Sequence, residues 1–213
     1  MKYDSVIFDL DGTLLDTLED LCDSVNFALR SFDMPERSLG EVRGFVGNGI
    51  GKLIKRSVPD GCSEELCNEV LDTFKAYYKD HSRDKTKPYE GIVSLLQRLK
   101  AEGTRTAIVS NKADFAVQEI VPVYFSGLID VAVGELSGVP RKPCPDMVHL
   151  AMERLSSGRA VYVGDSEVDV QTAKNAGLDG VFVTWGFRER EVLEGEGAKF
   201  IVDSANELWE VLS

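Results

Sequence analysis

The sequence predicts an α/β protein whose core is a doubly wound, Rossmann-like parallel sheet interrupted by an inserted all-helical domain. Two patterns support this prediction. From about residue 89 onward, short apolar runs alternate with segments of helical period, which is typical of βαβ units with a sheet covered on both faces. Between about residues 16 and 84 the apolar spacing is helical and indicates no strand. We therefore expect a core domain over residues 1–15 and 85–213 and a helical domain over residues 16–84.

The first predicted strand is the apolar run from Val6 to Phe8. It ends at two carboxylates, Asp9 and Asp11, and at Gly12, which suits a tight turn. In the inserted region, apolar residues recur at helical spacing, which predicts helices over residues 17–31, 39–45, 50–58 and 64–78. The polar stretch from residue 81 to 88 that closes this region is predicted to be a linker or hinge.

The second half of the chain alternates between predicted helices and strands. Strands are expected over residues 104–109, 128–133, 160–163 and 180–184. Helices are expected over residues 91–100, 113–124, 145–155 and 168–176, and the segments 188–193, 200–202 and 205–212 complete the chain. Pro122 should end or bend the second of these helices, because proline lacks the N–H that a helix interior needs.

The composition limits the partners and the location of the protein. The net charge of -12 comes from 24 basic and 36 acidic residues, which argues against broad binding to nucleic acid or to a membrane surface. No apolar run approaches the roughly 20 residues that a membrane span needs. The N-terminus leads directly into the first strand, so we expect no signal peptide and a cytoplasmic location. The four cysteines form no Cys-x-x-Cys pair, and we expect free thiols.

The pair Asp9 and Asp11 carries the clearest chemical signal. The carboxyl ends of strands are where ligands bind in open α/β sheets, and Asp9 and Asp11 follow such an end. Two carboxylates there can hold a hard cation such as Mg²⁺, and one of them can attack phosphorus. Taken alone, the pair is equally consistent with an acidic turn after a strand.

Three further polar groups follow or precede predicted elements. Ser110, Asn111 and Lys112 follow a strand, where a hydroxyl and the N–H groups of a helix start can bind phosphoryl oxygens, although such residues often cap a helix. Lys142 lies on a proline-stiffened loop and could face a carboxylate and a phosphoryl group, or else be a surface lysine. Asp165 ends another strand, and Asp169 lies four residues later, which suggests a second pair of metal-facing carboxylates or cap chemistry.

In this order, the four groups resemble the motifs of the haloacid dehalogenase superfamily of phosphatases, and the resemblance covers nearly the whole chain. The inserted helical domain resembles the cap of that family. Within the superfamily, the stretches Phe45 to Gly49 and Thr184 to Arg188 look most like phosphoglycolate phosphatases and their close relatives.

The resemblance implies a role for each core residue. Asp9 would be the nucleophile that becomes phosphorylated, and Asp11 the acid and base for the leaving alkoxide and the attacking water. Ser110 would hold a phosphoryl oxygen and Lys142 would neutralise charge. Mg²⁺ would be held by the Asp9 side chain, the Asp11 carbonyl and Asp165. Asp169 would lie close to the ion and contact its ligands or the ion itself.

Substrate contacts are expected from both domains. In the core we assign them to Gly12, Thr13 and Asn111. In the cap, the glycine-rich stretch Gly47, Asn48 and Gly49 indicates either close approach to the substrate or a loosely packed helix start. The cations Arg43, Lys52 and Arg188 are candidates for the far anionic end of the substrate, or else surface charges.

We therefore expect a Mg²⁺-dependent phosphatase for a small phosphate monoester, with 2-phosphoglycolate as the first choice. The cap is expected to hinge near Asp16 and near residues 84–88, closing over substrate. The alternatives are a β-phosphoglucomutase-like or pyrophosphatase-like member of the superfamily, a phospho-receiver signalling module, and a relative without catalysis. The receiver would be a shorter protein without the helical insertion. The partner is a small phosphate ester, and the protein is expected to be a monomer or homodimer.

Overall fold

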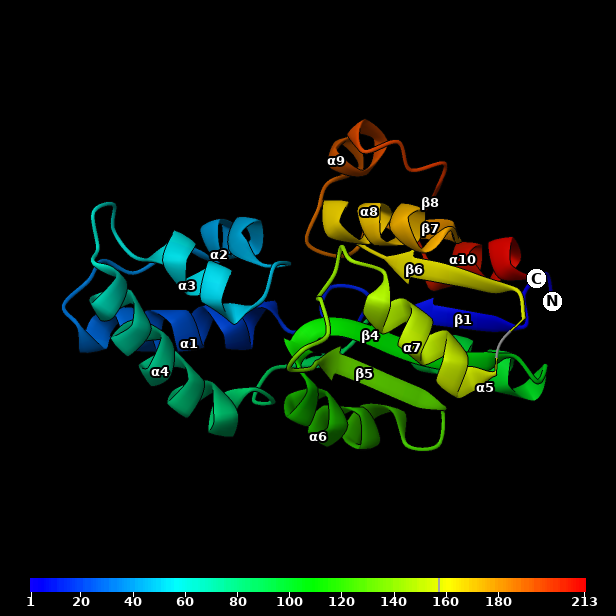
Figure 1. Cartoon of the computed structure of the whole chain (residues 1–213), viewed down its shortest axis with the longest axis horizontal. Helices are drawn as coiled ribbons and strands as arrows, with labels where there is room; N and C mark the ends of the chain where they lie inside the picture. The colour runs from blue at the N-terminus through cyan, green and yellow to red at the C-terminus, as the bar shows by residue number, and fades with distance from the viewer. Residues whose placement is uncertain (157) are drawn as a thin grey trace. The chain divides into compact units, whose positions relative to one another are not determined.

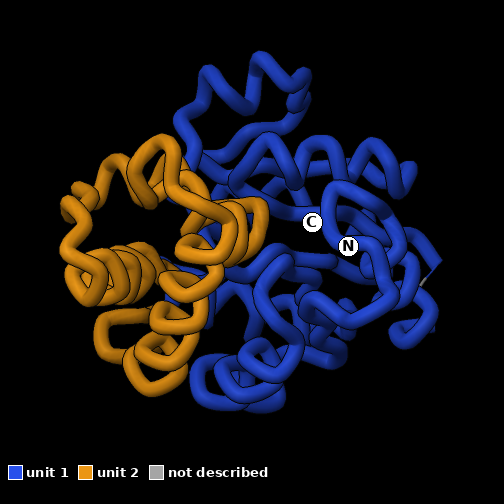
Figure 2. The backbone as a smooth tube through the Cα atoms, turned by 60° about the vertical axis from the view of Figure 1, so that its left-hand side comes forward, with its two compact units in different colours: residues 1–15, 88–213 blue, residues 16–87 orange. Residues whose placement is uncertain are grey.

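The computed structural model describes residues 1–156 and 158–213, which form two compact units (Figure 2). The larger unit comprises residues 1–15 and 88–213, and the smaller unit comprises residues 16–87. The chain returns from the smaller unit to the larger one between Lys87 and Pro88, three residues beyond the expected boundary after residue 84. The cause is local, because the backbone N–H groups of Lys85 and Thr86 donate to the Asp20 carboxylate at 3.0 and 2.9 Å.

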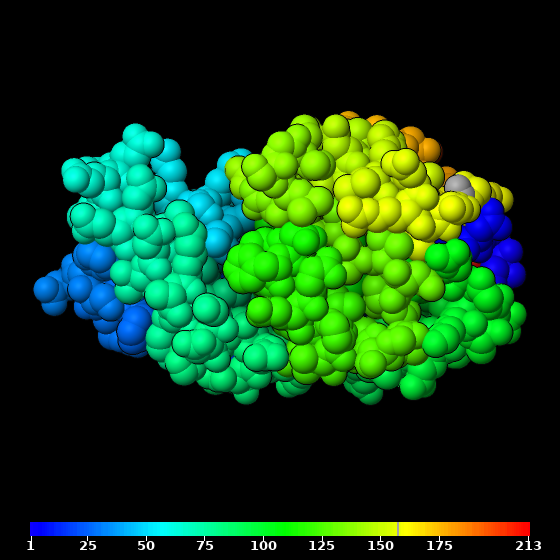
Figure 3. Space-filling view, turned by 60° about the horizontal axis from the view of Figure 1, so that its bottom comes forward, coloured from blue at the N-terminus to red at the C-terminus, as the bar shows by residue number. Residues whose placement is uncertain are grey.

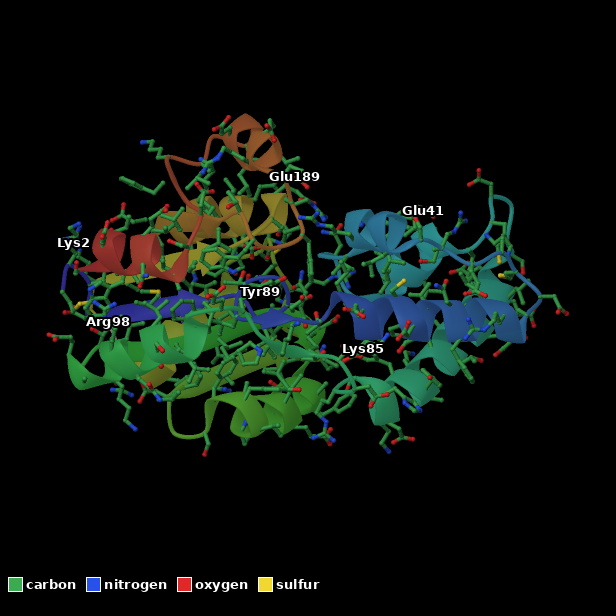
Figure 4. All side chains as sticks on the ribbon, turned by 180° about the vertical axis from the view of Figure 1, so that it is seen from behind. Lys2, Glu41, Lys85, Tyr89, Arg98 and Glu189 are labelled. Atoms are coloured by element: carbon green, nitrogen blue, oxygen red, sulfur yellow. The ribbon has the colours of Figure 1, made fainter. Side chains whose placement is uncertain are left out.

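Two short strands, β2 (Leu15–Asp16) and β3 (Lys87–Pro88), pair where the chain passes between the units. Lys85 and Tyr89, which precede and follow β3, are labelled in Figure 4. Lys85 is tied to the helical unit through Asp23, whose Oδ2 lies 2.7 Å from its Nζ. The N–H of Tyr89 donates to the carbonyl of Leu14 at 3.1 Å, which holds Tyr89 in the larger unit.

The larger unit is built on a six-stranded parallel sheet with the order β5-β4-β1-β6-β7-β8 (Figure 1). Its strands are β1 (Ser5–Phe8), β4 (Arg105–Ala113), β5 (Val131–Glu135), β6 (Ala160–Gly164), β7 (Asp179–Val183) and β8 (Phe200–Val202). The central strand β1 pairs with β4 and β6, so that Phe8 lies opposite both Ile108 and Val163.

Helices cover both faces of this sheet, which confirms the predicted α/β class. One face is packed by α5 (Ile92–Ala101), α6 (Asp114–Phe125) and α10 (Ala205–Leu212), and the other by α7 (Asp146–Leu155), α8 (Glu167–Ala176) and α9 (Arg190–Gly195). Val6 and Phe8 enter the first core and Ile7 the second, which is why β1 is apolar at every position. Figure 3 shows the outer surface of α6 and α7 in green and yellow-green. The Arg98 guanidinium, labelled in Figure 4, lies 3.9 Å from the ring centroid of Trp209 and joins α5 to α10.

The smaller unit is helical and contains α1 (Leu18–Ser31), α2 (Leu39–Phe45), α3 (Ile50–Ser57) and α4 (Glu64–His81). Ser38 and Glu41 form a capping box at the start of α2, and the Ser63 hydroxyl accepts the N–H of Leu66 at the start of α4. Helices α1 and α4 pack on each other, with the rings of Phe27 and Tyr77 stacked at 3.9 Å.

One local prediction is wrong. Ser110, Asn111 and Lys112 were expected at a helix start, but they belong to β4, which continues past a register shift to Ala113. Helix α6, which was expected to reach residue 124, continues past Pro122 to Phe125. Its buried apolar residues on both sides of Pro122 compensate for the lost backbone hydrogen bond, because they pack against the sheet.

The four cysteines are free thiols, as predicted. Among the described residues, no helix combines the length and the apolar character that crossing a membrane would require.

Candidate active site

The predicted core residues meet at the carboxyl edge of the sheet, around β1. Asp9 directly follows the end of β1, and its N–H donates to the Val163 carbonyl of β6 at 2.8 Å. Ser110 lies on β4 and Asp165 directly follows β6. Because β1 lies between β4 and β6, residues separated by more than 150 positions in the chain share one site.

Three buried carboxylates form the centre of this site. Oxygen atoms of Asp9, Asp165 and Asp169 lie within 4.8 Å of one another. Burial raises the pKa of Asp9 to about 7. Burial, followed by the negative charges of Asp169 and Asp9, raises the pKa of Asp165 well above its usual range. A buried surplus of negative charge with oxygen donors is the environment that fits a hard divalent cation.

Lys142 supplies positive charge to this cluster. Its Nζ lies 2.7 Å from Asp9 Oδ1 and 2.9 Å from Asp169 Oδ1. It also donates to the hydroxyl of Tyr162 at 3.0 Å. Burial lowers the pKa of the Lys142 ammonium, but the carboxylates of Asp169 and Asp9 outweigh that effect and hold the pKa well above its ordinary value. The lysine is therefore a buried, permanently charged group directed at Asp9, and not a surface lysine.

Protein donors occupy both oxygens of Asp169. Oδ1 accepts from Lys142 and from the Tyr162 hydroxyl, and Oδ2 accepts the N–H groups of Asp165 and Ser166 and the hydroxyl of Ser166. Burial raises the pKa of Asp169, but Lys142 and these hydrogen bonds outweigh it and lower the pKa below its usual value. Asp169 is thus an ionised carboxylate that orients its neighbours.

Asp165 is oriented from two sides. Its Oδ1 accepts from the Thr13 hydroxyl at 3.2 Å, and its Oδ2 accepts the N–H of Phe187 at 2.7 Å. Gly12 has a φ of +92°, and a Cβ there would lie 2.5 Å from Asp165 Oδ2. The structure therefore places Gly12 and Thr13, both expected to contact substrate, against Asp165. Their contact with a substrate stays a prediction.

The Ser110 to Lys112 segment contributes three different contacts. The Ser110 hydroxyl accepts the N–H of Lys112 at 3.2 Å. The side-chain amide of Asn111 donates to the carbonyl of Lys142 at 3.1 Å, which fixes the lysine loop. The Nζ of Lys112 lies 3.3 Å from Asp11 Oδ1. This segment therefore connects β4 to both Lys142 and Asp11.

The substrate-contact candidates of the inserted region belong to the smaller, helical unit, whereas the carboxylate cluster belongs to the larger unit. They are Arg43, Gly47, Asn48, Gly49 and Lys52. Asn48 Oδ1 accepts from Arg56 at 2.7 Å, and the φ angles of Gly47 and Gly49 are +120° and +82°. Those glycines are therefore required by the backbone of a tight turn. In the larger unit, Arg188 is held by Glu167 at 2.7 Å.

Three contributors to the site were not predicted as such. They are the hydroxyl of Tyr162, the backbone N–H of Phe187 and the ammonium of Lys112. Tyr162 left a signal, since it is the one residue with a polar tip inside the apolar strand Ala160 to Val163. The N–H of Phe187 left none, because backbone donors carry no sequence pattern.

Comparison with known proteins identifies the family of the chain. The family model described as haloacid dehalogenase-like hydrolase matches residues 6–183. A phosphoglycolate phosphatase of Cereibacter sphaeroides is 37% identical over 194 residues, covering 88% of each chain. One of Colwellia psychrerythraea is 31% identical over 212 residues, covering 95% of this chain and 94% of the relative. A crystal structure from Lactobacillus delbrueckii subsp. bulgaricus, provisionally named a phosphoglycolate phosphatase, has a TM-score of 0.95 and 38% identity, covering 100% and 99% of the two chains. The chain therefore belongs to the haloacid dehalogenase-like hydrolases, as the resemblance of its motifs predicted.

Proposed function

We propose that the protein is a Mg²⁺-dependent phosphatase that hydrolyses a small phosphate monoester through a phosphorylated Asp9, with 2-phosphoglycolate as its substrate. One observation carries the chemistry: Asp9 lies 2.7 Å from the buried ammonium of Lys142, inside a cluster of carboxylates. The substrate is taken from the relatives, several of which are named phosphoglycolate phosphatases.

In the first step, an Asp9 carboxylate oxygen attacks phosphorus and the bond from phosphorus to the ester oxygen breaks. Asp11, two residues along the same turn, gives its proton to the leaving alkoxide. Lys142 balances charge that develops beside Asp9. The products of this step are the free alcohol and an aspartyl-phosphate.

In the second step, water attacks the phosphorus of the aspartyl-phosphate. Asp11, now ionised, takes the proton of that water, and the acyl-phosphate bond breaks to give inorganic phosphate and the original Asp9 carboxylate. Ser110 is nearly fully buried beside this site, and its hydroxyl proton can be donated to a phosphoryl oxygen. Asp11 thus serves as acid and base in turn.

The side chains of Asp9 and Asp165 and the carbonyl of Asp11 would hold the Mg²⁺, since they offer the oxygen donors that this ion prefers. When bound, the ion would supply positive charge that stabilises the phosphoryl oxygens and offsets the acidic cluster. Asp169 is assigned a supporting role, because protein donors occupy its oxygens. The assignment of residues 16–84 as a cap that selects the substrate is part of the same proposal.

The test is phosphate release with and without Mg²⁺ from 2-phosphoglycolate, β-glucose 1-phosphate and pyrophosphate. We expect a strong, Mg²⁺-dependent preference for 2-phosphoglycolate, and no release by the Asp9→Asn variant. Weak activity on all three would leave the phosphatase chemistry standing and refute the substrate. Activity of Asp9→Asn close to that of the parent protein would refute the nucleophile.

A further inference from the structure

Lys112 is a buried cation to which the proposed mechanism gives no role. Within the part of the chain that the structure describes, two lysines are buried, Lys112 and Lys142. Lys142 is committed to Asp9 and Asp169. Lys112 has a side chain that is 7% exposed, and its Nζ lies 3.3 Å from Oδ1 of Asp11, the proposed general acid. A lysine is seldom buried without a specific charge partner to balance it.

The backbone fixes where this cation lies. Lys112 follows Ser110 by two residues on β4, and its N–H donates to the Ser110 hydroxyl at 3.2 Å. The residue between them, Asn111, is bonded to the carbonyl of Lys142. Lys112 therefore extends from the same rigid strand end that holds the proposed phosphoryl contact, and its ammonium lies on the leaving-group side, at Asp11.

We infer that Lys112 binds a carboxylate on the carbon next to the ester oxygen of the substrate, and so selects 2-phospho-carboxylates over phosphate esters whose leaving group has no carboxylate. This inference rests on the proposed function, because it uses Asp11 as the group that meets the ester oxygen. It deepens that function by assigning the residue that recognises the carboxylate of the substrate.

The distances support the inference. The ester oxygen must come within about 3 Å of the Asp11 carboxyl for proton transfer. In a 2-phospho-carboxylate, the carboxylate carbon is two covalent bonds of about 1.5 Å from that oxygen. The substrate carboxylate therefore approaches Asp11, and the cation already 3.3 Å from Asp11 Oδ1 lies within reach of both.

The charges of the site point the same way. A substrate carboxylate held among buried groups loses its hydration, which is unfavourable unless a cation pairs with it. Lys112 is the cation in that place, whereas Arg188 is paired with Glu167 at 2.7 Å, and Arg43 and Lys52 belong to the helical unit. The ammonium of a lysine can bind two carboxylates at once, because its three N–H donors point in different directions.

The test compares esters with and without the carboxylate. The parent protein and the variants Lys112→Met and Lys112→Arg are assayed with Mg²⁺ on 2-phosphoglycolate, ethyl phosphate and 4-nitrophenyl phosphate. For Lys112→Met we expect kcat/KM on 2-phosphoglycolate to fall at least tenfold more than kcat/KM on the two esters without a carboxylate, with the extra loss mainly in KM. Lys112→Arg should retain part of the preference. Lys100→Met is the matched control. It removes a surface lysine of α5 that is bonded to the Gly127 carbonyl, and it should change neither kcat/KM on 2-phosphoglycolate nor the preference for it.

Each other outcome overturns a defined claim. Equal losses on all three esters would show that Lys112 acts on Asp11 rather than on the substrate, which refutes the inference and keeps the proposed function. A parent protein without preference for 2-phosphoglycolate refutes both the proposed substrate and the inference. If Lys112→Met does not fold by circular dichroism, Lys112→Gln takes its place in the same comparison.

Discussion

The ammonium of Lys142 and the carboxylate of Asp9 lie 2.7 Å apart, with side chains that are 2% and 12% exposed. A buried ion pair is weak evidence for stability, because removing two charges from water offsets most of their attraction. Here burial raises the pKa of Asp9 to about 7 despite Lys142, so the pair only partly offsets the cost of burying this carboxylate. The arrangement therefore favours a chemical role over a structural one: it places a cation where charge develops on a phosphoryl group.

The first prediction concerns that cation. Replacing Lys142 with Met keeps most of the apolar side chain and removes its charge, so kcat should fall by on the order of 100-fold or more, the typical cost of losing one electrostatic donor. The metal-free variant should also lose about 3 kcal/mol of stability, because the buried, ionised Asp169 is left without its cationic partner. Steady-state phosphate release and urea unfolding measure the two effects. Unchanged kcat would remove Lys142 from the mechanism.

The second prediction concerns Gly12, where φ is +92° and a Cβ would lie 2.5 Å from Asp165 Oδ2. Gly12→Ala should displace the Asp165 carboxylate and raise the Mg²⁺ concentration needed for half-maximal activity at least tenfold. Gly138→Ala is the control, because Gly138 has a φ of +80° and no atom within 4 Å of its Cβ position. Both variants carry backbone strain of about 1 kcal/mol, but one of them also meets Asp165. An equal Mg²⁺ requirement in the two variants would contradict the prediction.

The position of the site could be predicted from sequence because of the geometry of a parallel sheet. Asp9 and Asp165 each follow an apolar strand, Ser110 lies near the end of another, and the carboxyl ends of neighbouring parallel strands lie at one edge. Most element boundaries also agree, since the apolar period changes where strands give way to helices. One exception is β4, which continues past a register shift to Ala113, and no local pattern indicates that shift.

What the sequence could not show is which polar group each site residue meets. Whether Asp169 binds a metal or orients Lys142 depends on where Tyr162 and Ser166 direct their hydroxyls. Thr13 could equally have faced a substrate, but the fold brings it to Asp165, 152 positions away in the chain. Such contacts depend on tertiary packing, so residue type and spacing leave them undetermined.

The third prediction links Mg²⁺ binding to pH. The pKa of Asp9 is raised to about 7, so the folded metal-free protein holds this proton more tightly than the unfolded chain does. The resulting stabilisation is fully present below the ordinary carboxyl pKa and is lost as the pH rises through about 7. Mg²⁺ binds the ionised carboxylate, so the rise in Tm on adding Mg²⁺ should be larger at about pH 8 than at about pH 6. Differential scanning fluorimetry of chelator-treated protein measures both. Asp9→Asn should show a smaller rise with weaker pH dependence, and an equal rise at both pH values in the parent protein would contradict the prediction.

The last prediction concerns Tyr162, whose hydroxyl accepts from Lys142 at 3.0 Å and donates to Asp169 Oδ1 at 2.9 Å. Burial, followed by the charge of Asp169, holds the pKa of this phenol well above its usual value, so the hydroxyl keeps its proton and can donate it. Tyr162→Phe leaves the ring in the core and removes both hydrogen bonds, each to a charged group and worth about 1.5 to 3 kcal/mol. Lys142 then loses one of the groups that direct it toward Asp9, so kcat should fall about tenfold with little change in KM. Tyr3→Phe is the matched control, because it removes a single half-buried hydrogen bond to Asp179 and should cost stability without altering kcat. If Tyr162→Phe lowers stability alone, at a temperature where both variants are folded, the hydroxyl supports the core and does not position the lysine.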